Sequence, residues 1–308
     1  MTLGEPRQAT GFGHGKVILL GEHAVVYGQP ALAAGMSAGV TVQVQARPGS
    51  GRLAAAAWSL DARAGDGSQV GRALDAILGR LRARDLDFTV DARIPARVGL
   101  GSSAALSVAV ARAAALETDA TDDEALRAAA DGEAVFHGSP SGIDAAAAAR
   151  GNVGRFQRDD GWRPVRVRAP LALCIGLSGV LHDTAAQVAA VRRLRDEAPV
   201  VDRVLETMGA VAEAGVKAVE AGEIARLGRL FDVAHGLLSS LGVSSPELDT
   251  MVNGARRAGA VGAKLTGAGG GGAAIALAPG REDDVLARWR ADGFDGFQTV
   301  VGGEAAAP

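Results

Sequence analysis

Two glycines and two serines precede an alanine-rich helical pattern and form a candidate phosphate-binding loop. Gly99 and Gly101 let the backbone approach an anion closely, and Ser102 and Ser103 add hydroxyls for phosphate oxygens or a divalent metal. The start of the predicted helix supplies free backbone amides and a positive dipole end. The alternative is an ordinary loop with serine helix caps. The segment is not a Walker A loop, because no Gly-Lys-Ser/Thr ends it.

Two carboxylates stand out from the pattern around them. Glu133 follows Leu126 by seven residues and Ala129 by four, so it lies on the apolar stripe of a predicted helix. A carboxylate there is costly unless it is paired or binds a metal, although a side chain near a helix end can also reach solvent. Soon after, a turn at 137–144 rich in Gly, Pro and Ser leads to Asp144; the alternative is an ordinary surface turn.

Three ionisable side chains, Lys16, Glu22 and His23, lie in and just after a predicted strand at 16–20. Their setting among glycines and apolar residues indicates a site rather than a solvated run of charges. A lysine beside Asp144 would hold that carboxylate ionised. For a single histidine, the alternative is a core residue with a hydrogen-bond partner.

A third glycine-rich segment, KLTGAGGGG at 264–272, contains the spacing G-x-G-x-x-G. This spacing keeps open a nicotinamide-dependent oxidoreductase. The match is weak, because a strand is predicted at 273–277 where a dinucleotide-binding loop is followed by a helix. Close backbone packing beside a ligand fits the segment better.

Length indicates two domains, and the predicted strands and helices, which mix without regular βαβ spacing, indicate an α+β fold. The 308 residues have room for two domains, and 48% apolar residues suffice for a sizeable core. A formal net charge of −3 argues against a nucleic-acid binder that works through bulk positive charge. The single cysteine, Cys174, excludes an internal disulfide framework and reads as a small buried hydrophobe. With no apolar run long enough for a membrane span and no signal-peptide pattern, a cytoplasmic protein is predicted.

Periodicity places the main elements. Strands are predicted at 40–45 and 88–94, and a helix at 102–116. A second helix should start at Thr121 with a capping box to Glu124 and end near His137. Three further helices are predicted at 185–198, 202–220 and 224–238. The polar stretch 155–169 marks a domain junction, which gives domains at 1–165 and 166–308, and residues 302–308 read as a frayed tail.

In this order, the motifs resemble the GHMP kinase superfamily and, within it, the mevalonate kinases. The first motif reads GKVILLGEHAVVYG at 15–28, the second PARVGLGSSAA at 95–105, and the third is the segment 264–272. The turn at 137–144 matches the segment that bears the family's catalytic aspartate. Similarity of order and spacing extends from about residue 11 to about residue 278.

The resemblance implies ATP- and Mg²⁺-dependent phosphorylation of mevalonate to 5-phosphomevalonate in isoprenoid precursor synthesis. It implies two domains with a cleft between them, the first similar to domain 2 of ribosomal protein S5 and the second ferredoxin-like. The resemblance also makes a homodimer the expected assembly. The same chemistry on another small alcohol, such as homoserine, a sugar or phosphomevalonate, stays open, as does a ligand-binding protein that has lost catalysis.

Residue roles are implied by the same resemblance. Asp144 would be the catalytic aspartate and Lys16 its partner. Ser103 and Glu133 would hold Mg²⁺. The remaining assignments are ATP phosphate binding by Gly99, Leu100, Gly101, Ser102 and Ser103, and substrate binding by Glu22, His23, Thr184, Gly267 and Ala268.

The chain departs from the family pattern at five positions. They are His14 before the first motif, Arg97 in the phosphate loop, Leu106 after the serines, Ala234, and Ala273 after the glycine run. None coincides with the proposed catalytic pair or metal ligands. The departures bear on substrate identity and nucleotide affinity more than on the type of reaction.

Overall fold

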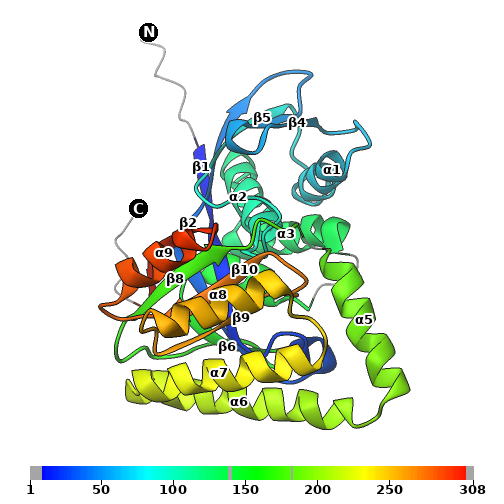
Figure 1. The fold of residues 1–308 in the computed structure, drawn as a ribbon. Coiled ribbons are helices and arrows are strands. Elements are labelled where there is room, and N and C mark those ends of the chain that lie inside the picture. The colour runs from blue at the N-terminus through cyan, green and yellow to red at the C-terminus, as the bar shows by residue number, and fades with distance from the viewer. Residues whose placement is uncertain (1–8, 138–140, 182, 303–308) are drawn as a thin grey trace. The chain divides into compact units, whose positions relative to one another are not determined.

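The structure is a computed structural model that describes residues 9–137, 141–181 and 183–302 (Figure 1). The chain divides into two compact units. The first unit contains the described residues of 1–15, 38–96 and 102–149, and the second those of 16–37, 97–101 and 150–308. Strands β1 (Ala9–Leu20) and β2 (Ala31–Ala46) pass from one unit into the other. Residues 138–140 of the predicted turn and 303–308 of the predicted tail lie outside the described residues.

The first unit carries a sheet built on the second half of β2. Residues 40–46 of β2 pair antiparallel with β5 (Leu86–Ala92), and β5 pairs parallel with β3 (Arg52–Ala55), which pairs with β4 (Leu60–Arg63). The alternation predicted at 40–45 is confirmed, because the three valines there are buried and both glutamines are exposed. A 3₁₀ turn, η2 (Ala56–Trp58), joins β3 to β4.

Small residues let the helices of the first unit pack closely. These helices are α1 (Gln69–Leu81), α2 (Ser102–Glu117), α3 (Asp122–His137) and α4 (Ile143–Arg150). A Cβ on Gly11 of β1 would lie 2.1 Å from the Ala109 carbonyl oxygen of α2, and one on Gly13 would lie 2.1 Å from that of Ala105. The alanines of α2 and the glycines of β1 are therefore required by the short strand–helix separation.

The helices predicted in the first unit are confirmed. The pattern at 102–116 corresponds to α2. The capping box is formed, because the Thr121 amide donates to Glu124 Oε2 at 2.8 Å and the Glu124 amide donates to Thr121 Oγ1 at 3.3 Å. Such reciprocal bonds satisfy helix-start amides that have no partner within the helix.

The second unit contains an antiparallel sheet in the order β11-β8-β10-β9. Its strands are β8 (Leu171–Leu177), β9 (Gly262–Thr266), β10 (Ala273–Leu277) and β11 (Asp295–Val301). In chain order the strands are first, second, third and fourth, so the sheet order is 4-1-3-2, with helices in both crossovers. This is the ferredoxin-like arrangement that the resemblance implies.

Five α-helices of the described chain belong to this unit, besides the 3₁₀ helix η1 (Ala24–Tyr27): α5 (Thr184–Glu197), α6 (Val201–Ala221), α7 (Ile224–Ser240), α8 (Pro246–Arg257) and α9 (Glu282–Ala291). Helices α6 and α7 lie side by side, and α8 packs on β9 and β10 (Figure 1). The helices predicted at 185–198, 202–220 and 224–238 and the strand at 273–277 are confirmed. No helix within the described ranges is long and apolar enough to cross a membrane.

The core of the second unit includes Trp289 of α9, which is fully buried and donates its indole N–H to the Met251 carbonyl at 2.8 Å. Cys174 of β8 is also fully buried. Burial is the main cause that raises the pKa of its thiol to about 12. The interpretation of Cys174 as a small buried hydrophobe is therefore confirmed, because the thiolate form is suppressed.

The predicted junction at 155–169 is in part a β-hairpin. Strands β6 (Val153–Gln157) and β7 (Gly161–Pro164) pair there, and β6 pairs with residues 31–34 of β2. The strands are short and the stretch is polar, so no strand was predicted there. The domain boundary near residue 165 stays a prediction, since the second unit also includes residues 16–37 and 97–101.

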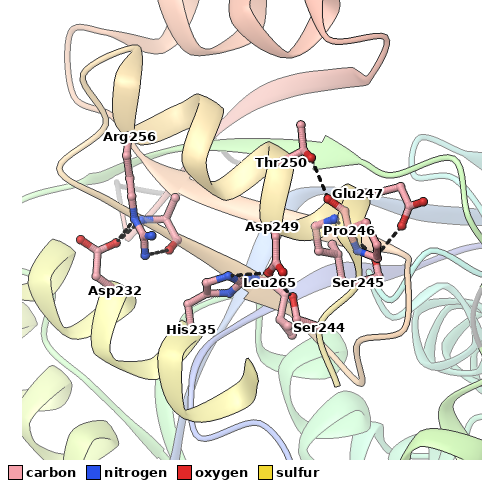
Figure 2. A network of polar contacts seen from close by, with 12 residues as sticks. Asp232, His235, Ser244, Ser245, Pro246, Glu247, Asp249, Thr250, Arg256 and Leu265 are labelled. Carbon is pink, nitrogen blue, oxygen red and sulfur yellow. Dashed lines mark hydrogen bonds and ion pairs between the residues drawn. The ribbon is translucent and has the colours of Figure 1, made fainter. Parts of the chain in front are cut away.

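A buried histidine joins α7, α8 and β9 (Figure 2). His235 of α7 is 7% exposed, and its Nδ1 accepts a hydrogen bond from the Leu265 amide at 3.4 Å. The neutral ring therefore carries its proton on Nε2, which donates to Asp249 Oδ1 at 3.2 Å. The same carboxylate oxygen accepts a hydrogen bond from Ser244 Oγ at 2.6 Å.

Beside it, Asp232 and Arg256 form a second link between the same elements (Figure 2). Arg256 Nε donates to Asp232 Oδ1 at 2.7 Å, and the same oxygen accepts the Ala263 amide at 3.1 Å. Burial lowers the pKa of His235, and the charges of Arg256 and Lys264 act in the same direction, whereas Asp249 opposes them. His235 is therefore stabilised in its neutral form.

This arrangement predicts a pH-dependent free energy of unfolding. The folded pKa of His235 lies below its ordinary value of 6.5, so the unfolded chain binds more protons than the folded one as pH falls through 6.5. The free energy of unfolding is therefore highest above pH 6.5, where the ring is neutral in both states, and it decreases on acidification. We expect His235→Gln to reduce the slope of unfolding free energy against pH between 6.5 and 5, by up to about 1.4 kcal/mol per pH unit.

Urea unfolding at pH 7, 6 and 5 measures this slope. Glutamine offers an acceptor to Leu265 and a donor to Asp249, so the variant should retain a folded structure at pH 7. Equal slopes for the variant and the unchanged protein would show that His235 does not set the acid sensitivity.

Candidate active site

Lys16 and the loop at 97–101 lie together in the second unit. The Lys16 amide donates to the Leu100 carbonyl at 2.9 Å. Gly101 has φ +75°, and a Cβ there would lie 2.6 Å from Lys16 Cγ, so only glycine fits. Lys16 is 3% exposed, which places a buried cation directly against the loop. The loop leads straight into α2, whose first residues are Ser102 and Ser103.

In the first unit, the serine hydroxyl and the carboxylate predicted to bind a metal lie together. Ser103 Oγ donates to Glu133 Oε1 at 3.2 Å. Glu133 is 1% exposed, which confirms its place on the buried stripe of α3. A Cβ on neighbouring Gly132 would lie 2.7 Å from Ile77 Cδ1, so this part of α3 packs closely against α1.

Asp144 lies in the first turn of α4 and is partly buried. The residue before the helix, Gly142, has φ +90°, a conformation that favours glycine and turns the chain into the helix. A carboxylate in the first turn is stabilised by the positive end of the helix dipole. Asp144 belongs to the first unit and Lys16 to the second, and their pairing stays a prediction.

Glu22 forms an ion pair that connects the first motif to the third. Lys264 Nζ donates to Glu22 Oε1 and, at 2.6 Å, to the Leu265 carbonyl. Lys264 is 0% exposed and Glu22 is 1% exposed. Burial raises the pKa of Glu22 and lowers that of Lys264, and in each case the partner's charge is the largest opposing cause. The two charges therefore depend on each other.

A hydroxyl joins the same two motifs a few residues away. Thr266 Oγ1 accepts the Ile18 amide at 3.1 Å and donates to the Ile18 carbonyl at 3.0 Å. One side chain thus satisfies both backbone groups of a residue in β1. The third motif is fixed against the first by a threonine and a lysine, two residues apart in β9.

His23 is oriented by the third motif as well. Its Nε2 lies 2.9 Å from the Ala268 carbonyl, which is an acceptor, so the neutral ring carries its proton there. His23 is 5% exposed, and burial lowers the pKa of its imidazole. The alternative of a core histidine with a hydrogen-bond partner therefore describes its contacts, and its partner is Ala268, a predicted substrate residue.

The glycine run adopts conformations that other residues avoid. Gly267 and Gly269 through Gly272 all have positive φ. A Cβ on Gly270 would lie 2.2 Å from Gln187 Nε2 of α5, so the run lies against the first turns of that helix. Thr184 is the first residue of α5, after the N-cap Asp183. In the second unit, helix α5, which begins at Thr184, therefore lies against the glycine-rich loop that contains Gly267 and Ala268.

The dinucleotide-binding interpretation is wrong on this geometry. The glycine run leads into strand β10, not into a helix whose start would receive a pyrophosphate.

Within the described ranges, no group of three or more His, Cys, Asp or Glu side chains could hold a metal by itself.

Sequence reasoning missed two residues of this region, Lys264 as the partner of Glu22 and His235. Lys264 carried a signal, because a lysine in the apolar strand GAKLT must find an anionic partner. His235 carried no signal, since nothing local connects it to Leu265 or Asp249.

Comparison with known proteins agrees with these motifs. The model for the GHMP kinases N terminal domain matches residues 68–152, and that for GHMP kinases C terminal matches residues 216–295. The mevalonate kinase of Aeropyrum pernix is 38% identical over 301 residues, which cover 88% of this chain and 89% of that protein. That of Pyrococcus abyssi is 32% identical, with 91% of each chain covered.

Solved structures show the same likeness. The crystal structure of L. major mevalonate kinase in complex with R-mevalonate superposes with a TM-score of 0.85 at 28% identity, covering 98% of this chain and 99% of that one. A Streptococcus pneumoniae phosphomevalonate kinase, with a TM-score of 0.79 at 18% identity over 95% of this chain and 99% of that one, shares the fold. This chain therefore belongs to the GHMP kinase family.

Proposed function

We propose that the protein transfers the γ-phosphoryl group of ATP to the primary hydroxyl of mevalonate and forms 5-phosphomevalonate. The observation that carries this proposal is the match, over nearly the whole chain, to proteins named mevalonate kinases, at up to 38% identity in the relatives compared above. The L. major enzyme, which was crystallised in complex with R-mevalonate, adds support for this substrate. ATP is the phosphate donor of GHMP kinases, which supports it as the donor here.

The chemistry requires alignment and charge neutralisation more than covalent help from the protein. The loop at 99–103 would cradle the ATP phosphates with backbone amides and the hydroxyls of Ser102 and Ser103. Lys16, buried against this loop, would neutralise charge that develops during transfer. Asp144 would orient the mevalonate hydroxyl and accept its proton.

The donor set fits Mg²⁺, which would be held by Ser103 and Glu133. Both offer hard oxygen ligands, and their oxygens lie 3.2 Å apart. A site of one carboxylate and one hydroxyl suits Mg²⁺, because this ion keeps several waters and binds substrate phosphates as well. When bound, the ion would neutralise charge on the ATP phosphates.

The substrate side would be formed by the region where the first and third motifs meet. Glu22 and His23 come from the first motif, and Gly267 and Ala268 from the third. Thr184 would reach the substrate from the start of α5. A cytoplasmic location and a homodimer also remain part of this proposal; the single cysteine supports the first, and the family resemblance the second.

The reaction and its central residue can be tested together. We expect the purified protein to release ADP from MgATP only with mevalonate, not with homoserine, galactose or phosphomevalonate. Asp144→Asn should lower kcat by about 10²–10⁴-fold, because the proton acceptor is lost while its shape is kept. The measurement is coupled ADP release with each alcohol.

Asp61→Asn is the matched control, since Asp61 is an exposed carboxylate of the same unit, paired with Arg52. It should leave kcat unchanged. Turnover with a different alcohol would retain the kinase chemistry and reject mevalonate. Silence with every alcohol would reject catalysis and leave a ligand-binding protein.

The metal assignment predicts a change in Mg²⁺ dependence. Glu133→Gln should raise the Mg²⁺ concentration for half-maximal activity about tenfold or more, because the amide keeps the shape but loses the charge that binds the ion. Chelation by EDTA should stop turnover, and added Mg²⁺ should restore it.

ADP release measured against Mg²⁺ at fixed ATP gives the shift. Glu117→Gln serves as the control, because Glu117 is an exposed carboxylate at the end of α2 in the same unit. An unchanged Mg²⁺ requirement in Glu133→Gln would reject Glu133 as a ligand.

A further inference from the structure

The backbone at His23 is strained. Its φ of +58° and ψ of −48° lie in a region that L residues rarely adopt. The Glu22 carbonyl accepts the Ala24 amide at 2.6 Å, so residues 22–24 form the rare, strained type of γ-turn centred on His23. Such a conformation persists only where its surroundings enforce it, and it is concentrated at functional sites.

Contacts of the second unit hold this turn in place both before it and within it. Before it, Gly21 has φ +96°, and a Cβ there would lie 2.6 Å from Ala31 Cα. Within it, the Glu22 side chain is bound by Lys264, and the His23 ring by the carbonyl of Ala268. Both side chains of the turn are thus anchored to one short segment, 264–268.

Stability alone does not account for the buried ion pair. Both side chains are almost fully buried, and Glu22 Oε2 has no hydrogen-bond partner in the described part of the chain. Desolvating two charges costs about as much as their attraction returns, and a pair of apolar residues of similar volume often serves stability equally well. A hydrogen-bonded ion pair is directional, whereas an apolar contact is not. The bond from Lys264 therefore restricts where the Glu22 side chain, and with it the main chain of the turn, can lie.

Lys16 also acts on this pair. Its charge favours the ionised form of Glu22 and disfavours that of Lys264, so the carboxylate is influenced by two lysines of the same unit. Lys264 hydrogen-bonds to it through Nζ. Glu22 is thereby held toward β9 and the third motif.

We propose that Lys264 is a positioning residue of the substrate site, which acts through Glu22 to hold the strained turn at His23 and the imidazole against Ala268. The inference rests on the proposed function in one respect, that the turn serves mevalonate. Lys264 itself does not need to touch substrate, since its ammonium is fully buried and binds Glu22 and the Leu265 carbonyl.

The test compares Lys264→Met with the double variant Glu22→Gln/Lys264→Met. The single variant leaves the Glu22 carboxylate buried without its partner and should lower Tm, whereas the double variant removes both charges and should recover most of that loss. In both variants the KM for mevalonate should rise about tenfold, because the turn at His23 is no longer held. The KM for ATP should stay within twofold of that of the unchanged protein. Recovery of both Tm and the mevalonate KM in the double variant would overturn the proposal and leave a purely structural pair.

Arg155→Met is the matched control. Arg155 forms a partly buried ion pair with Glu213 in the same unit at 2.8 Å, and it has no place in the site described above. Its loss should change Tm and leave the mevalonate KM unchanged. An equal rise of this KM in the control would also overturn the proposal, because any lost ion pair would then suffice.

A second measurement does not depend on turnover. Burial holds the pKa of His23 below its ordinary value, so release of the turn should raise it toward 6.5. NMR titration of the histidine ring signals in protein without substrate, assigned with His23→Gln, reports this shift. An unshifted His23 in the folded double variant would reject the positioning role even if mevalonate is the substrate. Absent turnover in the unchanged protein would reject the proposed function alone.

Discussion

The buried ion pair between Lys264 and Glu22 is the interaction on which the geometry of the second unit's site depends. Two nearly inaccessible charges are tolerable only if they meet, so the end of β1 and the strand β9 must lie side by side. Thr266 adds hydrogen bonds to both backbone groups of Ile18 in β1. Once these strands are fixed, Lys16 on β1 supports the loop at 97–101 through its own amide, and the glycine run that follows β9 reaches His23.

In the first unit, the elements are positioned by close packing of small residues. There, backbones approach one another closely: Gly11 and Gly13 bring β1 against the alanines of α2, and Gly132 brings α3 against Ile77 of α1. Helix α2 is buried on nearly all sides, so its start cannot shift without disturbing the whole unit. Ser103, in the first turn of this helix, donates a hydrogen bond to Glu133 of α3, so the two proposed Mg²⁺ ligands already lie within 3.2 Å of each other.

Local patterns in the sequence predicted the elements whose stabilisation is local. Helix α2, the capping box at Thr121 and the alternation in β2 are each determined by residues within a few positions. The full length of β1 was not predicted, because Gly11 and Gly13 are typical of loops and their reason lies about a hundred residues away in α2. The first part of β2 is buried on both faces and so shows no alternation. The hairpin of β6 and β7 was not predicted within the polar stretch 155–169, since its pairing with β2 is not local.

For the site, the useful signal in the sequence was the cost of burying a charge. Glu133 is a candidate because a carboxylate on an apolar stripe is costly unless it is paired or binds a metal. The structure buries it beside Ser103. The same argument applies to Lys264, a lysine inside an apolar strand, and it demands an acidic partner without saying which. Sequence separation hides that partner, since Glu22 is 242 residues away. The strain at His23 cannot be seen in the sequence, because a γ-turn on a non-glycine residue has no local pattern and is held by contacts of Gly21 and of the Glu22 and His23 side chains.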